Sequence, residues 1–388
     1  MSSKNPFLPT FGTSPPFLAG RDREVARLSR ALREGPSHPD YTLLITGSRG
    51  SGKTVLLNEA EDSALSLGWR VISVSASVTD LAKRIAAAAL EHLREMSDGK
   101  QARRISSVQA LGVGVSWEDR GQDNGTPHAD LRSALTSLAE KQAESRTGLL
   151  LTVDELHALR LGDARELAVA VQHITRRELL PIAFVGAALP EIEGTLLNDR
   201  GMTFFQRCAR APLLPLGRAD TELALFRPIS DAGRAIADEA LALMTRRSRG
   251  HPYTIQLLGY HSWERAFEDQ GATSIGVEHA RAAIHEAERA EVEQIVKPIW
   301  TGLSEVDRSF VSAMALDTGD SAIADIADRL GRSTNYAQHY RRRLIDAGMI
   351  VPAGRGRVRL AYRGTRGWLS TLGFEVATER SRNRGPRP

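Results

Sequence analysis

One segment, Gly47-Ser-Arg-Gly-Ser-Gly-Lys53-Thr54, constrains the fold of this chain more than any other. It fits the pattern G-x-x-x-x-G-K-[ST], follows a short apolar run over residues 42–46, and precedes a helical pattern that starts at Thr54. Glycines at these positions let backbone N–H groups close around phosphate oxygens, and the following helix adds the positive end of its dipole. We expect Lys53 to reach the β- and γ-phosphates of ATP and the Thr54 hydroxyl to bind Mg²⁺. The residues predicted to hold the nucleotide here are Gly47, Ser48, Gly50, Ser51, Gly52, Lys53, Thr54 and Val55.

Three further apolar runs, over residues 69–75, 149–153 and 181–185, are typical of buried strands. Helical patterns separate the four runs, and strands that alternate with helices form a parallel sheet with crossover helices. The predicted fold class is therefore α/β, with a P-loop NTPase core. Residues 105–127 are polar and glycine-rich, which favours a surface insertion.

The apolar run over residues 149–153 ends in two carboxylates, Asp154 and Glu155. At the end of a core strand, Asp154 is expected to bind Mg²⁺ with Thr54, and Glu155 to act as the catalytic base that polarises a water. A strand that simply enters a polar helix start would look the same, but the phosphate-binding pattern about 100 residues upstream favours the functional reading.

Phosphoryl transfer often uses an arginine supplied by a neighbouring subunit. The segment after the fourth strand contains Arg207 and Arg210, and we expect Arg207 to be the catalytic arginine. A surface arginine, or one paired with a carboxylate, is an equally good explanation in a chain with so many arginines.

Four segments resemble one family of proteins. They are Phe17-Leu-Ala-Gly20-Arg21-Asp-Arg-Glu24, the phosphate loop, the Asp154-Glu155 strand and Gly250-His-Pro252. Together, over residues 17–370, they resemble the AAA+-type ATPases, and more narrowly the prokaryotic members with a C-terminal winged helix. That group includes the archaeal-type origin-recognition ATPases and the STAND signalling ATPases. The resemblance implies a helical lid, adenine contacts at Gly20 and Arg21, and a nucleotide contact from the lid at Pro252.

Two departures from the family pattern concern hydrolysis. The end of the fourth strand, residues 185–188, has no polar side chain where origin-recognition relatives carry Asn, Ser or Thr. The place of the lid arginine that senses nucleotide holds Gly250, His251 and Pro252. We therefore expect a slow ATPase.

The chain is expected to have five parts. Residues 1–16 read as an extended N-terminal arm and residues 17–215 as the ATPase core. Helical patterns at about 219–227, 234–247, 252–268 and 277–296 indicate a lid over residues 216–296. Pro298 and Gly302 are read as a boundary before a winged helix-turn-helix over residues 297–372, and residues 373–388 as a basic tail.

The C-terminal unit has the pattern of a DNA-binding helix-turn-helix. Ser304, Ser321 and Ser333 are expected to cap three helices, the first over residues 305–315 and the third from Thr334 to Ala347. A glycine-rich turn and a strand with alternating arginines, residues 350–363, are typical of a wing. The predicted DNA contacts are Asn335 and Gln338 to base edges, and Arg341, Arg342, Arg357 and Arg359 to phosphates.

The net charge of +4 is unevenly distributed. Residues 333–388 contain 12 Arg and Lys against 3 Asp and Glu, so this end carries +9 and the remaining residues −5. Such asymmetry favours a polyanion partner, which we take to be duplex DNA. Only 6 of the 51 basic residues are Lys, a bias that is also consistent with the base composition of the gene, so the arginine count alone does not establish a nucleic-acid partner.

The function predicted from these features is an ATP-binding and ATP-hydrolysing protein that couples its nucleotide state to duplex DNA binding. The alternative is a STAND-like signalling or scaffold ATPase whose winged helix docks protein. We expect a cytoplasmic protein without a membrane partner, with possible self-association through the ATPase core. The single cysteine, Cys208, excludes an intrachain disulfide and a cysteine-rich zinc site.

Overall fold

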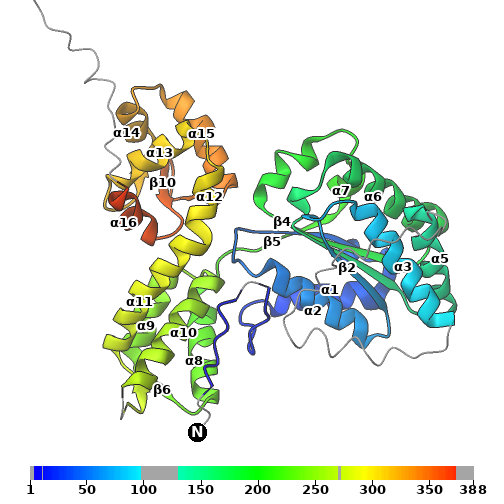
Figure 1. Ribbon diagram of the computed structural model, residues 1–388, viewed down its shortest axis with the longest axis horizontal. Coiled ribbons are helices and arrows are strands. Elements are labelled where there is room, and N and C mark those ends of the chain that lie inside the picture. The colour runs from blue at the N-terminus through cyan, green and yellow to red at the C-terminus, as the bar shows by residue number, and fades with distance from the viewer. Residues whose placement is uncertain (1–3, 11, 98–129, 270–271, 373–388) are drawn as a thin grey trace, which may run out of the picture.

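The computed structural model describes residues 4–10, 12–97, 130–269 and 272–372 (Figure 1). The predicted insertion at residues 105–127 and the basic tail at 373–388 lie outside the described residues. Within that described part, no helix is both long enough and apolar enough to cross a bilayer.

A five-stranded parallel sheet with the order β2-β3-β4-β1-β5 confirms the predicted α/β fold (Figure 1). The fifth strand was not predicted, because its sequence, Ala-Arg-Ala-Pro, lacks the β-branched and aromatic residues that favour strands. The strands are β1 (Thr42–Thr46), β2 (Arg70–Ser75), β3 (Leu149–Asp154), β4 (Ile182–Ala188) and β5 (Ala209–Pro212).

Helices cover both faces of the sheet, which is why its central strands are apolar at nearly every position. One face is covered by α1 (Asp22–Glu34) and α2 (Lys53–Ser66), and the other by α3 (Leu81–Ser97), α5 (Leu131–Glu144), α6 (Leu161–His173) and α7 (Thr203–Arg207). In β3, Leu150 packs beneath α1 and α2, whereas Leu149 and Leu151 pack beneath the helices of the other face.

A helical unit, which we call the lid, follows the sheet. It contains α8 (Arg218–Asp231), α9 (Asp238–Ser248), α10 (Pro252–Glu268) and α11 (Val277–Glu291), with a short parallel pair, β6 (Ala235–Ile236) and β7 (Ser274–Ile275). A π-helical turn, Val292–Val296, continues α11 into α12 (Lys297–Gly302). Pro298 follows this π turn directly and does not interrupt the helix, which continues to Gly302.

The C-terminal unit contains four helices and a three-stranded antiparallel sheet with the order β8-β10-β9. Ser304 and Ser333 cap helices as predicted, since each hydroxyl accepts a backbone N–H. The prediction for Ser321 is wrong: this residue pairs with Val358 in the sheet, and Ala322 is the cap position. The elements are α13 (Glu305–Ala315), β8 (Ser321–Ala322), α14 (Ile323–Arg329), α15 (Thr334–Asp346), β9 (Ile350–Pro352), β10 (Arg357–Leu360) and α16 (Gly364–Thr371).

The lid and the C-terminal unit share one hydrophobic core. Trp300 of α12 packs edge-on against Trp368 of α16, with ring centroids 5.4 Å apart. Val358, Leu360 and Tyr362 are buried on alternating positions of the β10 segment, as the sequence pattern predicted. Because the two units share this core, we expect them to move as one body.

The turn between α9 and α10 depends on a glycine. Gly250 has φ +72°, and a Cβ at this position would lie 2.1 Å from the Leu216 carbonyl oxygen. We expect Gly250→Ala to lower the free energy of unfolding by about 3 kcal/mol, because it adds a steric clash to the left-handed backbone. Urea unfolding of the full chain measures this change.

Gly233→Ala is the matched control. Gly233 has φ +83°, but a Cβ added there would have no atom within 4 Å, so only the backbone cost of about 1 kcal/mol applies. Equal losses of unfolding free energy in Gly250→Ala and Gly233→Ala would show that the steric clash with Leu216 does not contribute.

Candidate nucleotide-binding site

The glycine-rich loop connects β1 to α2 at the carboxyl edge of the sheet. Gly50 and Gly52 have φ +73° and +93°, which a side chain would strain, and the Ser51 N–H donates to the Ser48 carbonyl oxygen at 3.2 Å. The Gly47 N–H donates to the Ala188 carbonyl oxygen of β4 at 3.3 Å. The loop therefore wraps the N-terminus of α2 in a fixed backbone conformation.

Lys53 lies inside this loop and is buried. Its ammonium group donates to the Gly47 and Ser48 carbonyl oxygens, both at 3.0 Å. Burial lowers the pKa of Lys53, and the carboxylates of Glu155 and Asp154 act in the opposite direction. The cation is thus held in the loop and faces two acidic side chains.

The Thr54 hydroxyl donates to Asp154 Oδ2 at 2.6 Å, which joins two residues 100 positions apart in the chain. Asp154 Oδ1 accepts the Glu155 N–H at 2.7 Å, so both carboxylate oxygens are oriented. No group of three or more His, Cys, Asp or Glu side chains among the described residues could hold a metal alone. A hydroxyl and one carboxylate fit Mg²⁺, which usually takes its remaining ligands from water and substrate phosphates.

Glu155 has a left-handed backbone, φ +52°, and its carboxylate lies 3.1 Å from His157 Nε2. His157 Nδ1 accepts the Leu189 N–H at 3.3 Å, so Nε2 carries the proton that points at Glu155. This hydrogen bond is the main cause of a lowered pKa of Glu155. Sequence reasoning missed His157, although the absence of a polar side chain at the end of β4 was a signal that another residue serves that edge.

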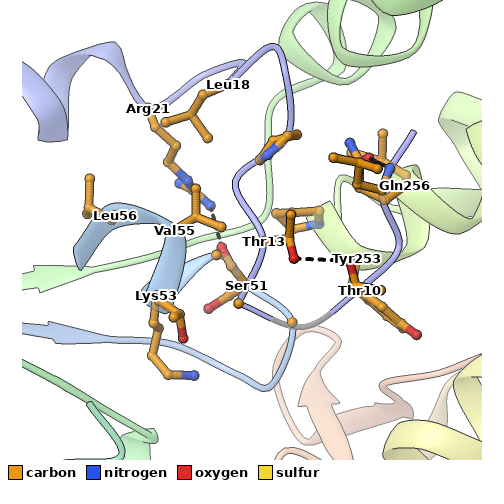
Figure 2. Close-up of a pocket in the computed structure, with 18 of the residues that line it drawn as sticks. Thr10, Thr13, Leu18, Arg21, Ser51, Lys53, Val55, Leu56, Tyr253 and Gln256 are labelled. Carbon is orange, nitrogen blue, oxygen red and sulfur yellow. Dashed lines mark hydrogen bonds between the residues drawn. The ribbon is translucent and has the colours of Figure 1, made fainter. Parts of the chain in front are cut away.

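A cavity of about 470 Å³ lies between the loop, the lid and the N-terminal residues (Figure 2). Its size is within the usual range for small-molecule sites. Eight predicted nucleotide contacts line it, as does Glu155, whereas Gly20, Gly47 and Ser48 lie outside its wall. The predicted residues in the wall are Arg21, Gly50, Ser51, Gly52, Lys53, Thr54, Val55 and Pro252.

Arg21 is buried and holds the back of the loop. Its guanidinium donates to the Ser51 carbonyl oxygen at 3.3 Å and to the Leu214 carbonyl oxygen at 2.8 Å. Gly20, with φ +65°, lies so close to Asp220 of α8 that a Cβ would be 2.9 Å from it. The two residues thus connect the loop to the start of the lid.

The lid and the C-terminal unit both contact the loop at Arg49. His251 Nε2 donates to the Arg49 carbonyl oxygen at 2.9 Å, and burial lowers the pKa of His251 to about 4, so the ring is neutral at pH 7. The Tyr362 hydroxyl donates to the same oxygen at 3.4 Å, and its ring meets the His251 ring at a centroid distance of 5.6 Å. The Tyr253 N–H of the lid donates to the Gly50 carbonyl oxygen at 3.2 Å. The alternating sequence pattern of residues 350–363 predicted that Tyr362 is buried, but not that its hydroxyl reaches the phosphate loop.

The structure does not bring Arg207 to the loop of its own chain. Arg207 precedes β5, whose first residue, Ala209, pairs with Leu43 near the start of β1, whereas the loop follows the other end of that strand. At about 3.3 Å per residue, four strand positions separate the two ends by roughly 13 Å. Arg207 is exposed, and Arg210 is paired with Glu193.

The six predicted DNA contacts lie on the C-terminal unit in two environments. Asn335, Gln338 and Arg342 are exposed on α15, and Arg341 is half-buried. Arg359 pairs with Asp320 at 2.8 Å, and Arg357 donates to the Asp320 carbonyl oxygen at 2.6 Å. Arg359 is therefore paired with a carboxylate within the unit, whereas Arg357 contacts only a backbone carbonyl there.

Comparison with known proteins agrees with this architecture. Residues 18–185 match the AAA ATPase domain family, and residues 293–369 match a domain of unknown function (DUF8462). No curated protein sequence is significantly similar to the chain.

Solved structures share the fold over nearly the whole length. The ORC2 protein of Aeropyrum pernix, solved as ADPNP–ADP complexes, is 16% identical with a TM-score of 0.62 over 96% of this chain and 98% of that one. A Walker-type ATPase of Pyrococcus abyssi is 13% identical with a TM-score of 0.63, covering 91% and 96% of the two chains. The Cdc6 protein of Pyrobaculum aerophilum is 15% identical with a TM-score of 0.50, covering 94% of each.

The predicted resemblance is confirmed at the level of domain and fold. This chain contains an AAA+-type P-loop ATPase domain, in a fold that it shares with the archaeal ORC2 and Cdc6 proteins.

Proposed function

We propose that this protein binds ATP with Mg²⁺, hydrolyses it slowly, and couples its nucleotide state to duplex DNA binding through a C-terminal winged helix. The observation that carries the proposal is the contact of His251 and Tyr362 with one carbonyl oxygen of the phosphate loop. A change in the loop upon nucleotide binding would act on both side chains directly.

Nucleotide binding uses the loop and the two strand ends beside it. Lys53 would exchange its bonds to loop carbonyls for the β- and γ-phosphates, and loop N–H groups would hold the remaining phosphate oxygens. Thr54 and Asp154 would hold Mg²⁺, which supplies charge stabilisation when it is bound. The adenine ring of ATP would lie in the cavity between Arg21, Val55 and Pro252.

For hydrolysis we assign Glu155 as the base that orients the attacking water and His157 as the residue that orients Glu155. The Leu189 N–H fixes the tautomer of His157, which then donates Nε2–H to one carboxylate oxygen and leaves the other for water. The lowered pKa makes Glu155 a weak base, which supports slow turnover. Arg207 would act only on the nucleotide of a second copy, so its role requires self-association.

Two hydrogen bonds would couple the phosphate loop and the lid to the C-terminal unit. Tyr362 contacts the loop, and the Arg249 guanidinium of the lid donates to the Leu360 carbonyl oxygen of β10 at 3.1 Å. The shared core of the lid and the C-terminal unit supports rigid transmission of a change in lid angle.

The winged-helix assignment rests on the order and pairing of α13 to α16 and of β8, β10 and β9. In such a unit α15 would enter the major groove, where Asn335 and Gln338 would contact base edges and Arg341 and Arg342 would contact phosphates. Arg357 and Arg359 would contact phosphates from the wing only by leaving Asp320, so we expect them to contribute less than Arg342.

A STAND-like scaffold ATPase is the second candidate. It is favoured by the contact of Tyr362 with the loop, through which the C-terminal unit would hold the lid closed, and by the internal pairing of Arg359. In that case the winged helix would dock a protein, and DNA affinity would be weak and nearly independent of salt.

The role of His157 is testable by substitution. We expect His157→Ala to lower kcat about tenfold while ATP affinity stays within twofold, because Glu155 loses the donor that orients it. The acidic limb of the kcat–pH profile should move to higher pH, since loss of that hydrogen bond raises the pKa of Glu155 and protonates the base earlier. Steady-state ATPase assays and equilibrium nucleotide binding measure both effects.

Two amide variants separate the two hydrogen bonds of His157, one to Glu155 and one from the Leu189 N–H. His157→Gln retains a donor near Glu155 and should keep most of the activity, whereas His157→Asn can accept only from Leu189 and should behave like alanine. Glu155→Gln is the reference for loss of the base. Full activity in His157→Ala would exclude the orienting role.

The coupling is testable by measuring DNA affinity in three states: with ADP, with ADPNP and without nucleotide. We expect affinities that differ by at least fivefold between states, and a log–log salt slope of about −0.9 for each phosphate contact. Arg342→Ala should make that slope less steep by about one contact. Tyr362→Phe should reduce the difference between states, because it removes only the hydroxyl that reaches the loop.

The control is Tyr41→Phe, which removes a buried core hydroxyl that has no hydrogen-bond partner among the described residues. Tyr41→Phe should leave the difference in DNA affinity between nucleotide states unchanged, and Lys53→Ala should abolish that difference. Identical DNA affinities in all three nucleotide states would refute the coupling, and a flat salt dependence would favour the scaffold function.

A further inference from the structure

The described N-terminal residues run from the lid to the ATPase core (Figure 1), and several of them line the cavity (Figure 2). We call the described residues Lys4–Thr10 and Gly12–Ala19 the N-terminal strap. From its start the strap lies along α10 of the lid, then reaches α2 of the ATPase core, and finally leads into α1. It therefore connects the two parts that enclose the cavity.

The lid end of the strap is anchored by a side chain in a fitted notch. Phe7 is 1% exposed, and its ring occupies the space beside Gly259 of α10, where a Cβ would lie only 2.3 Å from a ring atom. Asn5 Nδ2 donates to the Tyr260 carbonyl oxygen at 3.1 Å and to Glu264 Oε1 at 2.7 Å. A glycine in the middle of a helix costs about 1 kcal/mol relative to alanine, and here it admits the ring.

The core end of the strap is anchored on α2, the helix that begins in the phosphate loop. Asn58 Nδ2 donates to the Gly12 carbonyl oxygen at 3.2 Å and to Ser14 Oγ at 3.3 Å. A Cβ at Gly12 would lie 3.7 Å from Thr54 Cγ2, so the strap backbone lies next to the loop itself.

Between its two anchors the strap forms one wall of the cavity. Thr10 and Thr13 line it and share a hydrogen bond at 3.1 Å, and Gln256 accepts the Leu8 N–H at 3.0 Å from the same wall. Figure 2 shows Thr10 and Gln256 opposite Arg21 and Val55. A nucleotide in the cavity would thus contact side chains of the core, of the strap and of the lid.

We propose that the N-terminal strap is part of the nucleotide site and sets how long the nucleotide stays bound. The inference rests on the proposed function, namely that this cavity takes ATP and ADP. A nucleotide in contact with both walls leaves only when the strap separates from the lid or from the core. Undocking of Phe7 from the Gly259 notch frees the lid end of the strap and so opens the site.

The test is the dissociation rate of ADP from the full-length protein. Radiolabelled ADP is bound, chased with excess unlabelled ADP, and followed by rapid filtration, because a dye on the ribose would itself touch the strap. We expect Phe7→Ala to accelerate dissociation at least tenfold. Gly259→Val, which fills the notch from the helix, should act in the same direction without altering the strap.

Phe267→Ala is the matched control, since Phe267 lies on the same helix, is 51% exposed and does not line the cavity. Its dissociation rate should stay within twofold of the unchanged protein. If Phe7→Ala or Gly259→Val fails to fold, as thermal unfolding would show, Asn5→Ala removes two hydrogen bonds at the same anchor and should accelerate dissociation about threefold.

Three results would be decisive. Faster release in the anchor variants alone supports the proposal. Unchanged release in folded Phe7→Ala, Gly259→Val and Asn5→Ala would overturn it while leaving nucleotide binding intact. Failure of the unchanged protein to retain ADP at all would instead refute the proposed function and the strap with it.

Discussion

The carbonyl oxygen of Arg49 is the point on which the arrangement of this molecule depends. It accepts one hydrogen bond from His251 of the lid and one from Tyr362 of the C-terminal unit. Its position is fixed by the left-handed glycine that follows it in the loop. Three units that are far apart in the chain therefore meet at one peptide group of the phosphate loop.

The chemistry of the site depends on two contacts beside that peptide. Thr54 and Asp154 bring the start of α2 and the end of β3 within one hydrogen bond, and these are the two residues that we propose as Mg²⁺ ligands. His157 then connects the end of β3 to the end of β4 through Glu155 and Leu189. The end of β4 has no polar side chain of its own, and His157, which follows β3, places its imidazole there.

Much of the fold could be predicted because the signals are local. The loop pattern, the apolar runs and the serine caps at Ser304 and Ser333 each depend on residues close together in the chain, and each predicted its element correctly. β5 and the strand position of Ser321 were missed, because pairing with a distant strand decides them. Pro298 indicates a boundary in the sequence, and the π turn that carries the helix past this residue has no local sequence pattern.

The site was predicted less completely for the same physical reason. The contacts of Tyr362, Phe7 and His157 each depend on where another segment folds, by 313 positions along the chain in the case of Tyr362 and Arg49. Phe7 in particular lies in a proline-rich segment that has no periodic pattern, and its burial depends on the bare backbone at Gly259. Such complementary pairs cannot be recognised from one sequence without the fold.

The central claim is that the phosphate loop and the C-terminal unit respond together to nucleotide. Hydrogen exchange of the full chain, with and without ADP and Mg²⁺, tests it most directly. We expect amides of the loop and of residues 357–362 to gain protection at the same nucleotide concentration, and neither to respond in Lys53→Ala. Protection of the loop with unchanged exchange in residues 357–362 would contradict the account.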